Sequence, residues 1–232
     1  MGIITFFYLL KKPAPFGRHT KEGWGPMIDN KLGWMIMEIV SPIVFTLMLM
    51  YWAKEINFQK WLLLLLWNIH YLNRSIIFPL RIKTEGKKMP AAIMLSAVGF
   101  NIFNGLFNGY FLAVTDVNYS SVLFAIGLFI FISGFAINNI ADNMLINLRK
   151  PWETGYKIPQ GFLFKYISCP NHFGEIVEWA GFALMAWNYG ALSFLIWTFA
   201  NLAPRAFDHH KWYQNKFPDY PKDRKALIPF IV

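Results

Sequence analysis

The sequence predicts an all-α fold, a polytopic bundle of membrane-spanning helices with six full spans and a short N-terminal seventh. The first observation is composition: 56% of the 232 residues are hydrophobic, 19% are aromatic and only 15% are charged, which is too apolar for a soluble domain of this size. The second is that the apolar residues form runs long enough to cross about 30 Å of hydrocarbon as helices. These runs do not alternate with period 2, so strands are not expected.

The predicted spans follow one another with short connections. They lie at residues 33–53, 61–80, 90–114, 121–146, 173–188 and 190–207. A tight turn near Tyr189 and Gly190 separates the last two. Residues 2–10 are apolar but too few to span, so we expect a partial span or an interfacial helix there. No internal repeat divides the chain, which predicts one domain over residues 1–232.

The basic residues predict the orientation of this bundle. Of the 22 Lys and Arg residues, nineteen fall on one side of the threaded spans, and only Lys54 and Lys60 fall on the other. The positive-inside rule therefore places the C-terminus and the loops at 12–32, 81–89 and 147–172 in the cytosol. Topology also accounts for the net charge of +9, so nucleic acid is not an expected partner, whereas membrane lipid is.

Polar side chains gather at the cytosolic ends of the later spans. They are Asn138, Asp142, Glu175, Glu178, Arg205 and His209. Helical spacing places Glu175 with Trp179 on one face and His209 with Tyr213 on another. So many donors and acceptors at one depth indicate a large polar ligand.

A second polar stripe, Asn101, Asn104 and Asn108, lies at mid-membrane depth. Amides at this depth commonly hydrogen-bond neighbouring helices, so fastening helix to helix is the simplest interpretation of this stripe.

The loop at 149–172 combines turn residues with Arg149, Lys150 and Lys157. These cations could set topology, or they could bind phosphate oxygens. The sequence carries no G-x-G-x-x-G fingerprint, no Walker loop and no H-E-x-x-H, so any bound nucleotide must be held by the helical bundle itself. Cys169 is the single cysteine, and the adjacent His209 and His210 point to different helix faces, so no metal site is predicted.

Three motifs in the last third carry a family resemblance: LRKPWETGYKIPQG, GEIVEWAGF and RAFDHHKWYQNKFPDYPKDRKALIPF. With GRHT, GWMIME and HYLNR upstream, the chain resembles the steroid 5-alpha-reductase (3-oxo-5-alpha-steroid 4-dehydrogenase) family as a short, bacterial-type member. The resemblance implies a seven-helix membrane enzyme that reduces the carbon–carbon double bond of a 3-oxo-Δ4-steroid with NADPH. It implies a multi-pass protein of a bacterial inner membrane, or of the endoplasmic reticulum in a eukaryote, with the cofactor on the cytosolic side.

The resemblance also assigns roles to residues. Glu38 and Tyr71 resemble the pair that contacts the steroid 3-keto oxygen. The residues that resemble the cofactor-binding set are Asn138, Asp142, Arg149, Tyr156, Lys157, Asn171, Glu175, Trp179, Arg205, His209 and Tyr213. The chain departs from the family pattern at Met37, where glutamine is expected, and at Lys157, where arginine is expected.

The chemistry of such a site can be argued from the residues. Hydride addition to an enone requires a hydride donor near the β-carbon and stabilisation of the negative charge that develops on the ketone oxygen. Tyr71 can donate a hydrogen bond to that oxygen, and Glu38 in apolar surroundings could stay protonated as a second donor. Protonation of the enolate at the α-carbon completes the reaction.

Three alternatives stay open from the sequence. A related membrane reductase would act on polyprenols or enoyl thioesters. An isoprenylcysteine methyltransferase-like enzyme would use S-adenosylmethionine, but the basic loop favours a reductase. A transporter would need polar residues across the full membrane depth, and here they concentrate toward one side.

Overall fold

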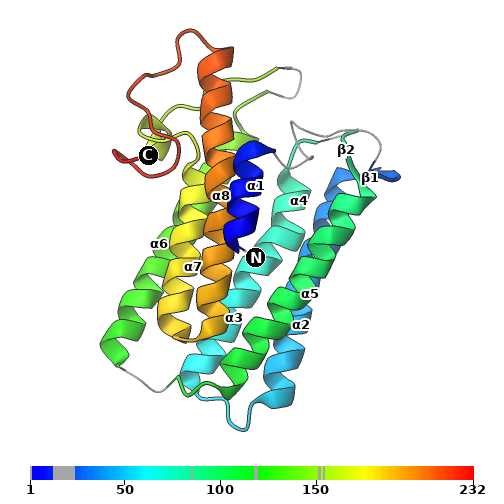
Figure 1. Ribbon diagram of the computed structural model, residues 1–232, viewed down its shortest axis with the longest axis vertical. Helices are drawn as coiled ribbons and strands as arrows, with labels where there is room; N and C mark the ends of the chain where they lie inside the picture. Colours follow the sequence, from blue (N-terminus) through cyan, green and yellow to red (C-terminus); the bar gives the residue numbers. More distant parts are fainter. Residues whose placement is uncertain (1, 13–23, 85, 118–119, 151–152, 154) are drawn as a thin grey trace. The chain divides into compact units, whose positions relative to one another are not determined.

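The computed structural model describes residues 2–12, 24–84, 86–117, 120–150, 153 and 155–232. These residues are mostly helical, as predicted, and Figure 1 shows the long helices. The chain divides into two compact units, which are described separately. Unit 1 comprises Met1–Pro13, Ala125–Phe182 and Leu195–Val232, and unit 2 comprises Ala14–Phe124 and Ala183–Phe194. A single domain over 1–232 stays a prediction.

Unit 2 is built on two parallel helices, α2 and α5, that pack along their length. Its elements are β1 (Met27–Asp29), α2 (Asn30–Trp52), α3 (Phe58–Leu72), the π-helix η2 (Asn73–Ile77), α4 (Phe78–Arg81), β2 (Lys88–Pro90) and α5 (Ala91–Val114). The antiparallel strands β1 and β2 lead directly into α2 and α5, so their pairing ties the N-terminal ends of those helices together. The all-α prediction missed this short pair, because three-residue strands carry no periodic signal.

Glycines let the two parallel helices approach closely. A Cβ atom added at Gly105 would lie 2.9 Å from the Val44 Cβ, and one added at Gly109 would lie 2.7 Å from the Phe45 carbonyl oxygen. Backbone therefore packs directly against backbone, as small residues permit between membrane helices. This contact fixes the register between α2 and α5.

Helix α3 runs in the opposite direction to α2 and α5. Near its start the Lys60 ammonium donates to the Ala113 carbonyl at the far end of α5, with an Nζ to O distance of 2.7 Å. Further along, the fully buried Trp67 stacks on Phe45, with 4.3 Å between ring centroids, and Tyr71 lies beside it at 5.2 Å. Tyr71 is thereby held in the core of unit 2.

Unit 1 contains the helices that carry most of the predicted cofactor residues. Its elements are α1 (Gly2–Lys11), α6 (Ser121–Ile146), the 3-10 helix η3 (Phe162–Lys165), α7 (Pro170–Ala186) and α8 (Tyr189–Lys216). The first residues of α6 and α8 and the last residues of α7 belong to unit 2. A Cβ atom at Gly174 would lie 2.5 Å from the Asn138 backbone nitrogen, and Cβ atoms at Gly134 and Gly181 would meet backbone closer still. Helices α6 and α7 are therefore antiparallel and in direct backbone contact.

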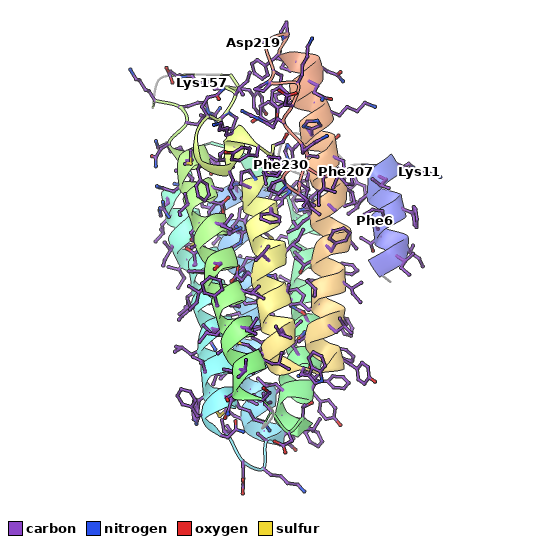
Figure 2. The ribbon with its side chains drawn as sticks, turned by 90° about the vertical axis from the view of Figure 1, so that its left-hand side faces the viewer. Phe6, Lys11, Lys157, Phe207, Asp219 and Phe230 are labelled. Carbon is purple, nitrogen blue, oxygen red and sulfur yellow. The ribbon has the colours of Figure 1, made fainter. Side chains whose placement is uncertain are left out.

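The N-terminal helix α1 packs against α8 (Figure 2). The Phe6 ring stacks on Phe199 with 6.2 Å between centroids and an interplanar angle of 9°. Phe6 also covers a buried cluster formed by Cys169, Ala203, Ala206 and Leu227. The predicted short N-terminal segment is thus a helix that is anchored to unit 1 by its aromatic face.

Three described helices are long and apolar enough to cross a membrane by length and composition: α2, α5 and α6. Their bounds lie within three residues of the predictions at 33–53, 90–114 and 121–146. The predicted span at 61–80 is interrupted by η2, and α7 and α8 are separated at Trp187 and Asn188, just before the predicted turn. The full count of spans and the cytosolic C-terminus stay predictions.

Candidate functional site

Helix α5 contacts Tyr71 and the backbone beside Glu38, the two predicted substrate-side residues, at positions one turn apart. The Asn104 side-chain amide donates to the Tyr71 hydroxyl oxygen at 3.1 Å, and Tyr71 is only 3% exposed. One turn earlier on α5, the Asn101 amide donates to the carbonyl oxygen of Met37, the residue before Glu38, at 2.6 Å. Neighbouring positions on α5 therefore hold the Tyr71 hydroxyl and the backbone next to the half-buried Glu38. The helix-fastening interpretation is confirmed for Asn101.

Four predicted cofactor residues form one hydrogen-bonded chain between α6 and α7. The Asn138 amide donates to the Asn171 carbonyl oxygen at 3.0 Å and to Glu175 Oε2 at 3.5 Å. The Asn171 amide in turn donates to Asp142 Oδ1 at 3.1 Å. The Gly174 contact permits this geometry, because it brings the two helices close enough for short side chains to meet.

Aromatic and imidazole rings line the part of α8 that carries the other predicted residues. His209 lies edge-on to His172 with 6.0 Å between centroids, and Tyr213 stacks on Tyr220 at 5.4 Å with an angle of 15°. Arg205 is one turn before His209 on the same face.

Trp179 lies apart from the polar residues in the core of unit 1. Its side chain is 1% exposed and packs edge-on against Phe182, with 5.5 Å between ring centroids. Such burial suits a residue that shapes the α7 face more than one that presents a polar edge to a ligand.

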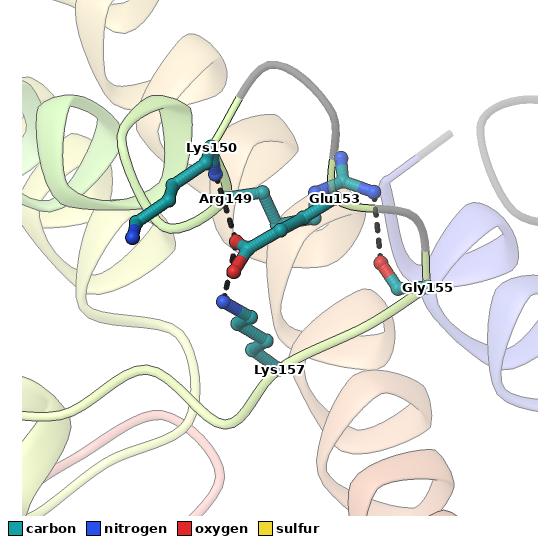
Figure 3. Close-up of polar contacts among 5 residues, drawn as sticks. All are labelled: Arg149, Lys150, Glu153, Gly155 and Lys157. Atoms are coloured by element: carbon teal, nitrogen blue, oxygen red, sulfur yellow. Dashed lines mark hydrogen bonds and ion pairs between the residues drawn. The ribbon is translucent and has the colours of Figure 1, made fainter.

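The basic loop after α6 is folded by its own polar contacts (Figure 3). Arg149 Nη1 donates to the Gly155 carbonyl oxygen at 2.8 Å. Glu153 Oε2 accepts from the Lys150 backbone nitrogen at 2.8 Å and from Lys157 Nζ at 2.5 Å, and the Lys157 hydrogen bond lowers the pKa of the Glu153 carboxyl. Glu153 was not among the predicted site residues, although it orients the Lys157 ammonium and holds the Lys150 backbone.

An aromatic contact connects this loop to α8. The Tyr156 ring meets Trp212 edge-on, with 4.7 Å between centroids. Exposed ion pairs such as the one between Glu153 and Lys157 contribute little stability by themselves. The contact between Tyr156 and Trp212 thus adds to the ion pair in holding the basic loop beside α8.

A further polar cluster, which the sequence did not reveal, binds the C-terminal segment. Ser168 Oγ lies 2.6 Å from His210 Nδ1 and 2.6 Å from the Tyr220 hydroxyl oxygen. Burial lowers the pKa of His210, and the nearby cations Arg224 and Lys225 add to that effect. The partners are far apart in sequence, so no local motif could have announced them. Within the described residues, no three His, Cys, Asp or Glu side chains gather as metal ligands.

Comparison with known proteins gives these arrangements a family. The model of the family described as 3-oxo-5-alpha-steroid 4-dehydrogenase matches residues 87–232, which include the basic loop, α7 and α8. The chain belongs to the steroid 5-alpha-reductase family. This membership confirms the resemblance found in the sequence.

Relatives match along the whole chain. The steroid 5-alpha-reductase DET2 of Gossypium hirsutum is 40% identical, over 100% of this chain and 93% of the relative. The 3-oxo-5-alpha-steroid 4-dehydrogenase 1 of Bos taurus is 38% identical with the same coverage. The 3-oxo-5-alpha-steroid 4-dehydrogenase 2 of Rattus norvegicus is 40% identical over 98% of this chain and 91% of the relative. The similarity therefore extends over both the predicted substrate-side residues and the predicted cofactor residues.

Proposed function

We propose that this membrane protein is an NADPH-dependent oxidoreductase that reduces the Δ4 double bond of a 3-oxo-Δ4-steroid to the 5-alpha-dihydrosteroid. Membership of the steroid 5-alpha-reductase family supports the reaction class. The observation that supports the mechanism is the buried Tyr71 hydroxyl, which Asn104 holds one turn from the contact between Asn101 and the backbone beside Glu38. An enone needs such a donor at its ketone oxygen.

Tyr71 and Glu38 would act on the ketone. As the β-carbon is reduced, negative charge builds on the 3-keto oxygen, and a donor aimed at that oxygen lowers the barrier. The Tyr71 hydroxyl would donate one hydrogen bond and a protonated Glu38 a second, an arrangement that also polarises a ketosteroid on an unrelated fold. The enolate is then protonated at the α-carbon.

Unit 1 offers a donor and acceptor set whose chemistry fits a dinucleotide phosphate. Arg149, Lys157 and Arg205 supply cations for phosphate oxygens, and Asp142 and Glu175 supply acceptors for hydroxyl groups. The remaining predicted contacts are Asn138, Tyr156, Asn171, Trp179, His209 and Tyr213. When bound there, NADPH supplies the hydride.

The proposed membrane arrangement puts the cofactor residues on the cytosolic side of a multi-pass protein. The pairing of β1 with β2 supports one part of it, because it joins two segments of unit 2 whose basic residues were predicted to share one side. The steroid, an apolar substrate, would reach unit 2 from the surrounding lipid.

The test is turnover by purified protein in detergent with NADPH and testosterone, with the product identified by mass. We expect a gain of two hydrogens that requires NADPH. Replacing Tyr71 by Phe should lower kcat by about 10²-fold, the usual loss for one oxyanion donor, without weakening NADPH binding. Tyr51→Phe is the matched control, because Tyr51 lies on α2 and is 80% exposed. Parent-like turnover by Tyr71→Phe would contradict the polarisation mechanism.

Related reductions are the second candidate function. If the protein binds NADPH but leaves testosterone unchanged, polyprenols and enoyl thioesters are the next substrates to test. The basic loop favours a reductase over a methyltransferase, because its cations Arg149 and Lys157 suit the phosphates of NADPH.

A further inference from the structure

Two asparagines on α5 form a hydrogen-bonded chain that ends on Tyr71. Asn108 Nδ2 donates to the Asn104 backbone carbonyl oxygen at 3.0 Å and to Asn104 Oδ1 at 2.9 Å. Asn104 Nδ2 donates to the Tyr71 hydroxyl oxygen at 3.1 Å. All three side chains are buried, with exposures of 3% for Asn108, 6% for Asn104 and 3% for Tyr71.

The direction of this chain follows from its first bond. A backbone carbonyl can only accept, so the group of Asn108 that meets the Asn104 carbonyl must be its NH2. That same NH2 meets the Asn104 side chain, which must therefore present its oxygen. The NH2 of Asn104 is then the group that faces Tyr71, and the Tyr71 oxygen accepts. Tyr71 must consequently direct its own proton to an acceptor other than Asn104.

Helix fastening does not explain Asn108. Both of its hydrogen bonds stay within α5, so they join no second helix. Its own Oδ1 is buried without a hydrogen-bond partner among the described residues, and an unpaired buried acceptor lowers stability. The feature that Asn108 does provide is the orientation of the Asn104 amide.

We propose that Asn104 and Asn108 are positioning residues that set the Tyr71 hydroxyl as a donor toward the substrate ketone. The proposal rests on the proposed function, since it assumes that Tyr71 polarises a ketone. The amide that donates to the phenolic oxygen also strengthens the hydrogen bond that the phenol donates, because linked hydrogen bonds polarise one another. Asn104 therefore acts on the reaction through Tyr71, without touching the substrate.

A double-mutant cycle tests this relation. Asn104→Leu keeps the side-chain size and removes the donor, and we expect kcat to fall about tenfold, within the range for residues that interact by direct contact. The apparent affinity for NADPH should not change. In a Tyr71→Phe background the same substitution should have no further effect on kcat, because the group on which Asn104 acts is already absent. Independent, multiplying losses would overturn the proposal.

The control is Asn68→Leu, which removes another amide of unit 2. Asn68 Nδ2 donates to Thr46 Oγ1 at 3.3 Å and so joins α3 to α2. This variant should lose thermal stability and keep the coupling between Tyr71 and the ketone. An equal loss of kcat in Asn68→Leu would show that any broken interhelical amide has the same effect, and would overturn the proposal.

A spectroscopic measurement separates this proposal from the proposed function. The probe is testosterone labelled with 13C at the ketone carbon, bound to the protein with NADP+ so that no turnover occurs. We expect the ketone resonance to move downfield on binding, and to move less in Asn104→Leu. Failure of the parent to bind the steroid contradicts the proposed function, whereas binding with the same shift in parent and variant contradicts the positioning role alone.

If Asn104→Leu does not fold, Asn104→Asp is the isosteric substitute. A protonated aspartic acid can still donate to Tyr71, whereas the ionised form only accepts and draws the Tyr71 hydroxyl hydrogen bond to itself, away from the ketone. We expect kcat of this variant to fall with rising pH over a range in which the parent is constant. A pH profile that matches the parent would overturn the proposal.

Discussion

The glycine contact between α6 and α7 gives a prediction that can be worked out from distances. A Cβ atom at Gly174 would lie 2.5 Å from the Asn138 backbone nitrogen, whereas ordinary contact begins at 3.4 Å, so Gly174→Ala must separate the helices by about 0.9 Å. The same separation would stretch the 3.0 Å bond from Asn138 to the Asn171 carbonyl oxygen beyond hydrogen-bonding distance.

We expect two consequences of Gly174→Ala. Overpacking at a well-packed interface costs about 1–3 kcal/mol of stability, which should appear as a lower unfolding temperature. Loss of the amide chain should also raise the Kd for NADPH roughly tenfold, the effect of about 1.4 kcal/mol. Calorimetric titration with NADPH and a thermal unfolding scan measure the two effects on the same sample.

Gly181→Ala is the matched control on the same helix. Its Cβ atom would meet the Phe131 backbone nitrogen, two turns away from the Asn138 chain. This variant should lose stability to a similar extent and bind NADPH like the parent. If both variants lose the same affinity for NADPH, or if Gly174→Ala binds NADPH like the parent, the amide chain between α6 and α7 does not hold the cofactor.

Three other predictions concern charged groups. Arg149→Ala should lower the affinity for NADPH more than the affinity for NADH in binding titrations if its guanidinium meets the 2′-phosphate. Equal losses of affinity would contradict that role. Lys60→Met leaves the Ala113 carbonyl without its 2.7 Å donor and should lower the unfolding free energy by about 1–3 kcal/mol, with NADPH affinity unchanged. Burial lowers the pKa of His210 from its ordinary 6.5, so the folded protein favours the neutral ring, which hydrogen-bonds Ser168. The free energy of unfolding that this neutral ring contributes is present above that pH and is lost as the pH falls below it. The unfolding temperature of the parent should therefore drop on acidification, and His210→Gln should drop less.

Composition and helical spacing were enough to predict the parts of the fold that depend on one helix at a time. The bounds of α5 and α6 follow from uninterrupted apolar residues. Asn138 with Asp142 could be placed on one face by spacing, and the structure joins that face to Asn171 and Glu175. Which side chain meets which across two helices depends on register, and that information is not local.

The spacing of the glycines in α6 and α7 predicts that these helices pack together, although the sequence prediction did not include it. Gly127 and Gly134 are seven residues apart on α6, and Gly174 and Gly181 are seven apart on α7, so each pair lies on one face over two turns. Two such pairs indicate that the helices pack directly on each other. By contrast, nothing in the sequence pairs Ser168 with His210, since their contact depends on how the C-terminal segment folds back.

The stripe of asparagines on α5 shows where sequence reasoning gave only part of the answer. The spacing placed Asn101, Asn104 and Asn108 on one face, and fastening helices was the simplest role. Asn101 joins α5 to α2 and Asn104 joins α5 to α3 through Tyr71, so both have that role, whereas Asn108 donates only within α5. The partner of each amide, which decides the difference, can be read only from atomic contacts.

The most direct test of the proposed reaction is the fate of a labelled hydride. The purified protein would be given testosterone and NADPH that carries deuterium at the transferable position, and the product would be analysed by mass and NMR spectroscopy. The account predicts one deuterium on the ring carbon β to the ketone and one solvent hydrogen on the α-carbon. Deuterium at another position, or a product without deuterium, would contradict reduction of a ketone-polarised double bond.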